Sequence, residues 1–177
     1  SLLAEAVERC PTSASARRAY AETLWHRQAF DTALQEMESA LRLDATDAEA
    51  AVRLGQMLLT LGMVDKARAR ADQALDNDPQ LASAWHLRGR AQQAVGHVDQ
   101  ALADLNRALD LTPDNRDVLL DVAELYRSQN QPRRALATLQ HLADLYPARE
   151  EPGHVLYLQG LASVALGRYQ QAIDFLQ

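Results

Sequence analysis

Residues 82–115 read ASAWHLRGRAQQAVGHVDQALADLNRALDLTPDN, and the 34 residues before them, 48–81, read AEAAVRLGQMLLTLGMVDKARARADQALDNDPQL. Aligned without a gap, the two stretches place Gly55 opposite Gly89 and Ala67 opposite Ala101. Prolines extend this period along the chain, with spacings of 68, 34 and 34 residues between Pro11, Pro79, Pro113 and Pro147. A fixed period of this length indicates a repeat protein in which similar units stack on one another.

The period divides the chain into repeats. The complete repeats are 14–47, 48–81, 82–115 and 116–149. Residues 1–13 fit the second helix of a truncated repeat, and residues 153–177 fit a partial fifth repeat. Residues 150–152 are an insertion, either a tolerated longer loop or a change in the superhelical angle. We expect a single array over residues 1–177, and a fragment of a larger protein, because neither end has the polar cap that a solenoid needs.

Composition and small residues predict paired helices. The chain is rich in Ala and Leu and holds one isoleucine, Ile173, which favours helix over strand. Small residues recur at repeat position 8, as Ala21, Gly55, Gly89, Ala123 and Gly160. Alanine recurs at position 20, as Ala33, Ala67, Ala101, Ala135 and Ala172. Small residues that face each other allow two helices to cross closely, so each repeat is expected to be a packed helix pair.

The segment between the two helices of a repeat carries turn signals. Position 15 is occupied by Gln28, Gly62, Gly96, Asn130 and Gly167. Gly and Asn accept the left-handed backbone conformation that ends many helices. Three residues later, Asp31, Asp65 and Asp99 are expected to accept backbone N–H groups at the start of the second helix. The residues before them, Phe30, Val64 and Val98, are expected to form a hydrophobic staple.

These columns resemble the tetratricopeptide repeat (TPR) family, which has Trp, Leu, Gly and Tyr in helix A and Ala, Phe, Ala and Pro in helix B. The third repeat matches best, with Trp85, Gly89, Ala101, Leu105, Ala108 and Pro113 at family positions. Arg17 and Ala51 depart from the pattern, because they replace the aromatic residue at position 4. The resemblance implies an all-α fold, a right-handed superhelical solenoid of antiparallel helix pairs with about 11 helices.

Several function classes are disfavoured. With 24 acidic and 18 basic side chains the formal charge is -6, so no basic surface for nucleic acid is expected. No apolar run approaches the roughly 20 residues that span a membrane, so no direct membrane insertion is expected. The five histidines lack the spacing of helical metal ligands and Cys10 is the single cysteine, so we expect no metal and no cofactor. No nucleophile motif is present, so we expect no enzyme.

The resemblance also implies a ligand groove lined by the A helices. In the TPR family, positions 2, 5, 6, 9, 12 and 13 point toward the concave face, and helical periodicity agrees because they form one stripe. The candidate peptide-binding residues on this stripe are Arg18, Glu22, Trp25, His26, Arg53, Gln56, His86, Arg90, Asp121, Glu124 and Tyr157. In the fifth repeat the stripe is much more apolar.

Two features of the stripe leave alternatives open. Arg18, Arg53 and Arg90 either face a carboxylate or an acidic segment of a ligand, or pair with acidic neighbours on adjacent repeats. Trp25 either anchors a ligand or fills the space that Arg17 leaves in the aromatic slot.

We therefore expect a protein–protein interaction scaffold that binds an extended peptide or a partner helix in its concave groove. The alternative is a structural spacer or assembly arm of a larger enzyme, membrane or secretion component, with no ligand in the groove. A homodimer through the uncapped solenoid ends is a further alternative. The high Ala, Arg and Leu content is typical of a GC-rich bacterial gene, and nothing in the sequence indicates a compartment.

Overall fold

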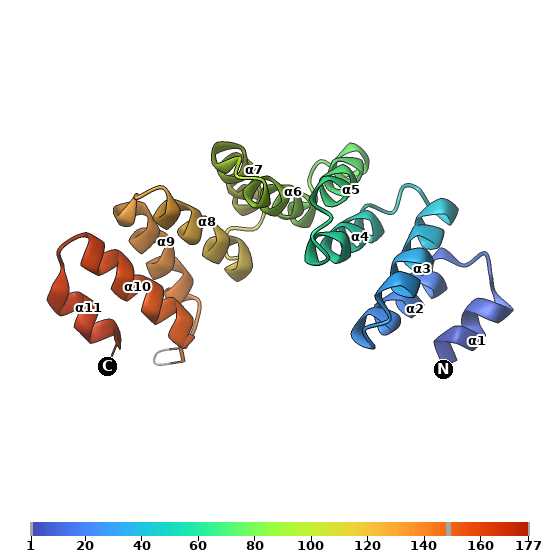
Figure 1. Ribbon diagram of the computed structural model, residues 1–177, viewed down its shortest axis with the longest axis horizontal. Coiled ribbons are helices and arrows are strands. Elements are labelled where there is room, and N and C mark those ends of the chain that lie inside the picture. The colour runs from blue at the N-terminus through green and yellow to red at the C-terminus, as the bar shows by residue number, and fades with distance from the viewer. Residues whose placement is uncertain (1, 148–149, 177) are drawn as a thin grey trace. The chain divides into compact units, whose positions relative to one another are not determined.

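The computed structural model describes residues 2–147 and 150–176, and every regular element in this part of the chain is an α-helix (Figure 1). The eleven helices of these residues are α1 (Leu2–Arg9), α2 (Ala14–His26), α3 (Phe30–Leu43), α4 (Ala48–Thr60), α5 (Val64–Asn77), α6 (Ala82–Ala94), α7 (Val98–Leu111), α8 (Arg116–Ser128), α9 (Pro132–Asp144), α10 (Gly153–Ala165) and α11 (Tyr169–Leu176). The predicted all-α class and helix number are confirmed. None of these described helices is long and apolar enough to cross a membrane.

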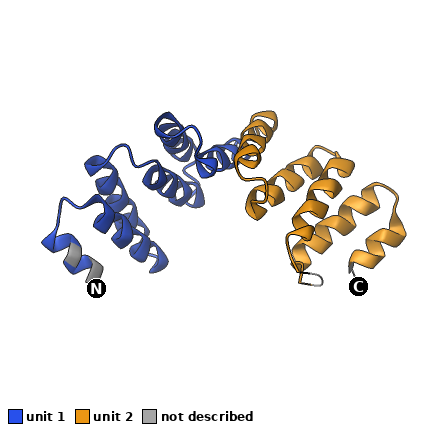
Figure 2. Cartoon of the chain, turned by 180° about the vertical axis from the view of Figure 1, so that it is seen from behind, with its two compact units in different colours: residues 1–95 blue, residues 96–177 orange. Residues whose placement is uncertain are grey.

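The chain forms two compact units, residues 1–95 and residues 96–177 (Figure 2). Unit 1 contains α1 to α6, and unit 2 contains α7 to α11. Each complete repeat frame begins with a helix A (α2, α4, α6 or α8) and continues with a helix B (α3, α5, α7 or α9). The frame 82–115 is divided, because its α6 belongs to unit 1 and its α7 to unit 2.

The turns between helix A and helix B are set by one residue in the left-handed conformation. The φ angles at repeat position 15 are 62° for Gln28, 75° for Gly62, 81° for Gly96, 54° for Asn130 and 73° for Gly167. The predicted helix ends are therefore confirmed in all five repeats. Glycine adopts this conformation without a steric penalty, whereas Gln28 and Asn130 hold it at some cost.

The starts of the B helices differ from the prediction. Asp31 is the second residue of α3, and the residue at the N-cap is Ala29, which offers no side-chain cap. Met63 and His97 occupy the same place before α5 and α7 and also make no side-chain cap hydrogen bond. The cap therefore lies two residues earlier than predicted. Asp31, at the second helical position, still favours the helix through its charge in the first turn.

Side-chain caps are found instead on A helices. The N-cap residues Ser13, Asp47 and Asn115 each accept a hydrogen bond from the backbone N–H three residues later. All three stand at the last position of a repeat frame, so the cap recurs with the period. Helices α2, α4 and α8 thereby begin at a fixed residue, which sets where the following stripe of side chains lies, whereas Leu81 and Pro152 before α6 and α10 make no such bond.

Small residues allow the close helix crossing that the sequence predicts. Ala21, Ala33 and Ala67 are completely buried in unit 1. A Cβ atom built on Gly55 would lie 2.3 Å from Cδ2 of Leu87 and 3.3 Å from the carbonyl oxygen of Ala67. Position 8 of α4 therefore packs against position 20 of α5, and the atoms around Gly55 leave no room for a larger side chain at this position.

Arg17 replaces the usual aromatic residue at position 4 and keeps one of its contacts. Trp85, the aromatic residue at this position in the third repeat, donates from Nε1 to the carbonyl oxygen of Pro79 at 2.9 Å. Arg17 donates from Nε to the carbonyl oxygen of Pro11, also at 2.9 Å, and forms an ion pair with Glu36 at 2.6 Å. Arg17 therefore departs from the family pattern but keeps the hydrogen bond to the preceding turn.

The insertion lies in the connection between α9 and α10. The earlier connections from a helix B to the next helix A run over residues 44–47, 78–81 and 112–115, whereas this one runs over residues 145–152. Three residues are inserted and α9 ends one residue early relative to the period. Of this segment, Ala148 and Arg149 lie outside the described residues.

Candidate functional site

Two neighbouring cavities open beside α2 and α4 in unit 1. The larger has a volume of about 440 Å³ and is lined by Ser15, Arg18, Ala19, Glu22, Glu49, Val52, Arg53, Gln56 and Ser83. The smaller has a volume of about 190 Å³ and is lined by Glu22, Trp25, His26, Arg53, Gln56, Met57 and Thr60. Glu22, Arg53 and Gln56 line both cavities, so the two adjoin and form one surface, which we call the α2/α4 groove.

The α2/α4 groove brings together six of the eleven candidate residues. They are Arg18, Glu22, Trp25, His26, Arg53 and Gln56. They converge because they lie on the same stripe of two consecutive A helices, and the N-cap residue Asp47 fixes where α4 begins. His86 and Arg90 lie on α6 and line neither of the two cavities.

The arginines of the α2/α4 groove are paired with carboxylates of the protein itself. Nη1 of Arg18 lies 2.9 Å from Oδ2 of Asp47 and 3.8 Å from Oε2 of Glu49. Nε of Arg53 lies 3.5 Å from Oε1 of Glu22, and its Nη1 donates to Oε1 of Gln56 at 3.2 Å. Arg53 therefore pairs with Glu22 on the adjacent repeat, which is the second of the alternatives left open by the sequence. The nearest partner of Arg18 is Asp47, the last residue of its own repeat frame, and Glu49 on the next repeat is more distant.

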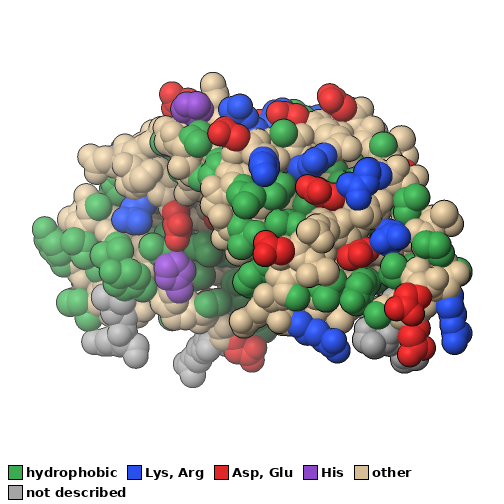
Figure 3. Space-filling model, turned by 45° about the vertical axis from the view of Figure 1, so that its right-hand side comes forward, with side chains coloured by type: hydrophobic (Ala, Val, Ile, Leu, Met, Phe, Trp, Pro, Cys, Tyr) green, Lys and Arg blue, Asp and Glu red, His purple; other side chains and the backbone are tan. Residues whose placement is uncertain are grey.

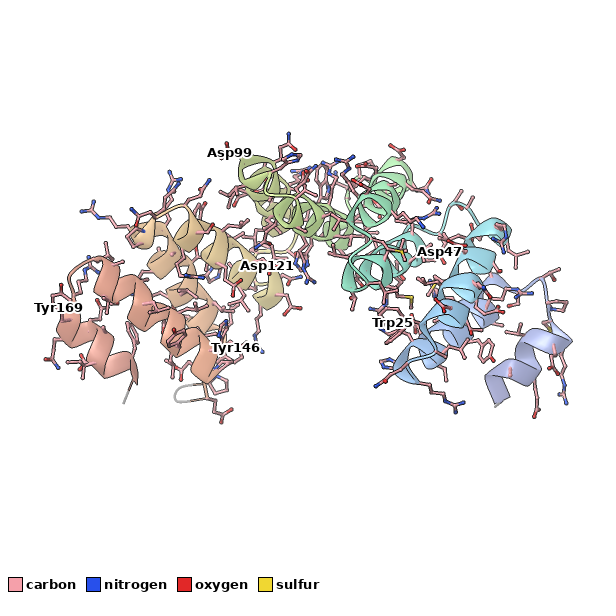
Figure 4. The ribbon with its side chains drawn as sticks, in the orientation of Figure 1. Trp25, Asp47, Asp99, Asp121, Tyr146 and Tyr169 are labelled. Atoms are coloured by element: carbon pink, nitrogen blue, oxygen red, sulfur yellow. The ribbon has the colours of Figure 1, made fainter. Side chains whose placement is uncertain are left out.

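Asp47 was not among the candidate residues, although it organises this surface. Its Oδ1 accepts the backbone N–H of Ala50 at 2.9 Å, and its Oδ2 accepts from Arg18. One carboxylate therefore caps α4 and holds the arginine of α2. Asp47 is labelled in Figure 4. The recurrence of Ser, Asp and Asn at the last position of the repeat frame was a sequence signal for the cap, but not for the ion pair.

Trp25 lies at the edge of the smaller cavity. Its ring is half-buried, packs edge-on against the ring of Phe30 at a centroid distance of 4.7 Å and contacts the unit 1 core. Met57 and Thr60 on α4 line the same cavity. Trp25 therefore packs on the core of unit 1 and also lines the groove, while Arg17 keeps the position 4 contact with Pro11.

Unit 2 carries three candidate residues, Asp121 and Glu124 on α8 and Tyr157 on α10. Glu124 of α8 interacts with His154 of α10, with 3.4 Å between Oε1 and Nε2. Asp121 is half-buried on α8, and Tyr157 is exposed on α10. Leu161 and Val164 are exposed on the same face of α10, which continues the apolar character expected for this repeat. Figure 3 shows hydrophobic side chains exposed over the C-terminal helices, at the left of the view.

Some positions of the predicted stripe belong to the core. The side chains of Val52, Leu87 and Leu158 are only 3%, 2% and 4% exposed. They occupy positions 5 and 6, which sit at the border between the stripe and the packed face of a helix. Where such a position carries an apolar side chain, packing against neighbouring helices covers nearly all of it, although Val52 still lines the larger cavity.

The described residues hold no group of three or more His, Cys, Asp and Glu side chains that could bind a metal ion. The α2/α4 groove is lined instead by charged, amide and hydroxyl groups beside Trp25 and Met57. Such a surface can accept hydrogen bonds, ion pairs and an apolar side chain.

Two family models match the sequence. The model described as "Cytochrome c-type biogenesis protein H TPR domain" matches residues 70–177. The model described as "Tetratricopeptide repeat" matches residues 24–91. A comparison with curated proteins gave no match.

Solved structures share the fold at low sequence identity. PilW, a widely conserved type IV pilus biogenesis factor, is 22% identical with a TM-score of 0.88, and the match covers 98% of this chain and 79% of that one. The pilF protein of Pseudomonas aeruginosa is 20% identical with a TM-score of 0.87, covering 98% and 78%. YrrB, described as a TPR protein with an unusual peptide-binding site, is 19% identical with a TM-score of 0.73, covering 99% and 89%. At these identities the likeness shows the fold alone.

Proposed function

We propose a function on the premise that the chain belongs to the tetratricopeptide repeat family and, within it, to the cytochrome c-type biogenesis protein H TPR domains. In this proposal the α2/α4 groove binds a polypeptide segment of another protein. The observation that carries the proposal is the convergence of six candidate residues on two adjoining cavities. TPR proteins generally act as non-catalytic interaction scaffolds. The chemistry of the groove supports binding, because amide and charged groups surround one half-buried tryptophan.

The dimensions and lining of the groove support an extended ligand. The two cavities follow α2 and α4 along their length, from Ser15 and Glu49 near the helix starts to His26 and Thr60 at their ends. An extended segment exposes its backbone, and Gln56, Ser15 and Ser83 provide amide and hydroxyl groups that can hydrogen-bond to it. We infer that such contacts give the affinity and that Trp25 and Met57 hold one apolar side chain.

The family match supports a finer proposal about the process. The matching model is named for cytochrome c-type biogenesis and covers residues 70–177. We propose that the bound polypeptide belongs to the assembly of c-type cytochromes. Deleting the gene should lower the amount of protein with covalently bound haem, measured by haem staining of gels. An unchanged haem pattern would contradict this finer proposal and leave the groove itself as a binding site for another polypeptide.

The groove proposal is tested by peptide selection against the whole chain. A library of random peptides displayed on phage is enriched on the immobilised protein, and the affinities of the enriched peptides are measured by fluorescence anisotropy. The variant Thr60→Arg places a long charged side chain in the smaller cavity and should weaken binding at least about tenfold.

Thr138→Arg is the matched control. Oγ1 of Thr60 donates to the carbonyl oxygen of Gln56 at 2.9 Å, and Oγ1 of Thr138 on α9 makes the same bond to Arg134 at 3.0 Å. The control should bind as the parent does. If no peptide is enriched, or if both variants bind equally, the α2/α4 groove is not the binding site and the alternative of a structural spacer gains support.

A further inference from the structure

The arginine at the start of the α2/α4 groove is held by the fold. Arg18 donates to Oδ2 of Asp47 at 2.9 Å, and the other oxygen of Asp47 is held by the backbone N–H of Ala50 at 2.9 Å. The side chains of Arg18 and Asp47 are 33% and 25% exposed. A ligand carboxylate would have to compete with a carboxylate that is already bound at both oxygens. Arg18 is therefore a poor receptor for an acidic ligand.

Carboxylates outnumber arginines around the larger cavity. Arg18 and Arg53 contribute two positive charges, and Glu22, Asp47 and Glu49 contribute three negative charges. The Glu49 side chain is 74% exposed and its contact to Arg18 is long, at 3.8 Å. Glu49 therefore keeps most of its capacity to accept hydrogen bonds from a ligand, and the local charge favours a cation.

The smaller cavity lies further along the same helix and is less polar. Met57 follows Glu49 by eight residues on α4, which corresponds to about 12 Å along a helix axis. An extended chain advances about 3.3 Å per residue, so this distance corresponds to about four residues. Side chains four residues apart in an extended chain point to the same side. One segment can therefore place one side chain at Glu49 and another beside Trp25 and Met57.

We propose that the α2/α4 groove selects an internal, extended segment in which a lysine or arginine and a large apolar residue stand about four residues apart. The basic side chain pairs with Glu49, and the apolar side chain enters the cavity lined by Trp25 and Met57. This specificity is the reverse of the acidic or carboxylate ligand that the three stripe arginines suggested as one alternative. The inference rests on the proposed function of unit 1 and names the chemistry of its partner.

The probes are short fluorescent peptides with blocked ends, so that no terminal charge contributes. Each carries one lysine and one leucine about four residues apart in a serine and glycine background, in both chain orders, because the groove does not fix the direction. Anisotropy measures their binding to the whole chain. In at least one order the peptide should bind. Replacing its lysine with glutamate should weaken binding about tenfold, and replacing its leucine with serine should have an effect of the same size.

Variants of the protein assign the selectivity to Glu49. Glu49→Gln should weaken binding of the lysine peptide by about five- to tenfold. Glu49→Lys should reverse the preference, so that the glutamate peptide binds more tightly than the lysine peptide. The matched control Glu38→Gln removes an exposed carboxylate from α3, at a separate cavity lined by Arg42 and Arg70, and should leave binding unchanged.

Two results overturn the proposal. One is a glutamate peptide that binds the parent protein as tightly as the lysine peptide, and the other is a preference that Glu49→Gln and Glu49→Lys leave unchanged. The probes can fail to bind while peptides from the phage selection bind the parent protein and lose affinity for the Thr60→Arg variant. In that case the proposed specificity is wrong, and the α2/α4 groove remains the binding site. If the selected peptides bind the Thr60→Arg variant as tightly as the parent protein, the proposed function itself is wrong.

Discussion

Replacing Gly55 with alanine tests the close crossing of two helices in unit 1. A Cβ at this position would meet Cδ2 of Leu87 at 2.3 Å, and the carbonyl oxygen of Ala67 and Cβ of Arg70 at 3.3 Å each. Leu87 is only 2% exposed, so its side chain has little space into which it can move. The substitution therefore forces overlap inside the core.

Two opposing terms set the magnitude of the Gly55→Ala effect. Alanine stabilises a helix interior by about 0.5–1 kcal/mol relative to glycine. Overpacking a well-filled core costs about 1–3 kcal/mol. The expected result is a net loss in the free energy of unfolding of about 0–2.5 kcal/mol, whereas helix propensity alone predicts a gain.

The variant Leu87→Ala shows whether the overlap is the cause. It removes the Cδ2 atom that the new Cβ would meet, and costs about 2–5 kcal/mol by itself because the side chain is buried. In this background Gly55→Ala should no longer destabilise, and should stabilise by up to about 1 kcal/mol. The coupling energy between the two sites should therefore be about 1–3 kcal/mol.

Urea denaturation measured by tryptophan fluorescence suits this test. The chain has two tryptophans, Trp25 and Trp85, and both lie in unit 1 with Gly55. Gly153→Ala is the control, because a Cβ there meets nothing within 4 Å, and its effect should stay within about 0.5 kcal/mol. Gly153 lies in unit 2, so the unfolding of this variant is followed by circular dichroism. A Gly55→Ala variant that stabilises the protein equally in both backgrounds would refute the close crossing.

Three further predictions concern stability. Asp47→Ala should lower the free energy of unfolding by about 1–2 kcal/mol, because it removes both the cap on α4 and the ion pair with Arg18. Asp47→Asn keeps the cap and should cost less than about 1 kcal/mol. Equal losses for the two variants in thermal denaturation would show that the cap has no role. Gln28→Gly should stabilise by about 0.5–1 kcal/mol because φ at this residue is 62°, and a lower midpoint in urea would contradict this reasoning. Ala101→Leu should cost about 1–3 kcal/mol because Ala101 is completely buried, and an unchanged melting temperature would argue against its place in the repeat.

Features that depend on neighbours in the sequence were predicted well. Position 15 was predicted to end helix A, with Gly and Asn accepting the left-handed conformation there, and Gln28 in the same column adopts it as well. The period carried this information because a turn between two helices is decided within a few residues. The start of α3 was placed less well, because Asp31 is a good cap by residue type but the turn geometry puts Ala29 at the cap position.

The candidate site was predicted only as a stripe of positions. Six of its residues converge on the α2/α4 groove, but helical periodicity did not show that Val52 and Leu87 at stripe positions would be buried. It also gave no role to Asp47, which lies in a connection between helices. Burial and pairing depend on the neighbouring repeat, and a stripe drawn on one helix contains no information about that neighbour.

The sequence by itself determined the helices, the ends of the A helices and the small residues where helices cross, because a 34-residue period repeats the same local interactions along the chain. Only the tertiary structure decided the chemistry of the groove. Arg18 and Asp47 are 29 residues apart and meet because α2 and the start of α4 are brought together by packing. That contact occupies Arg18 and leaves Glu49 exposed, so the charge offered to a ligand follows from the packing of adjacent repeats rather than from the number of arginines on the stripe.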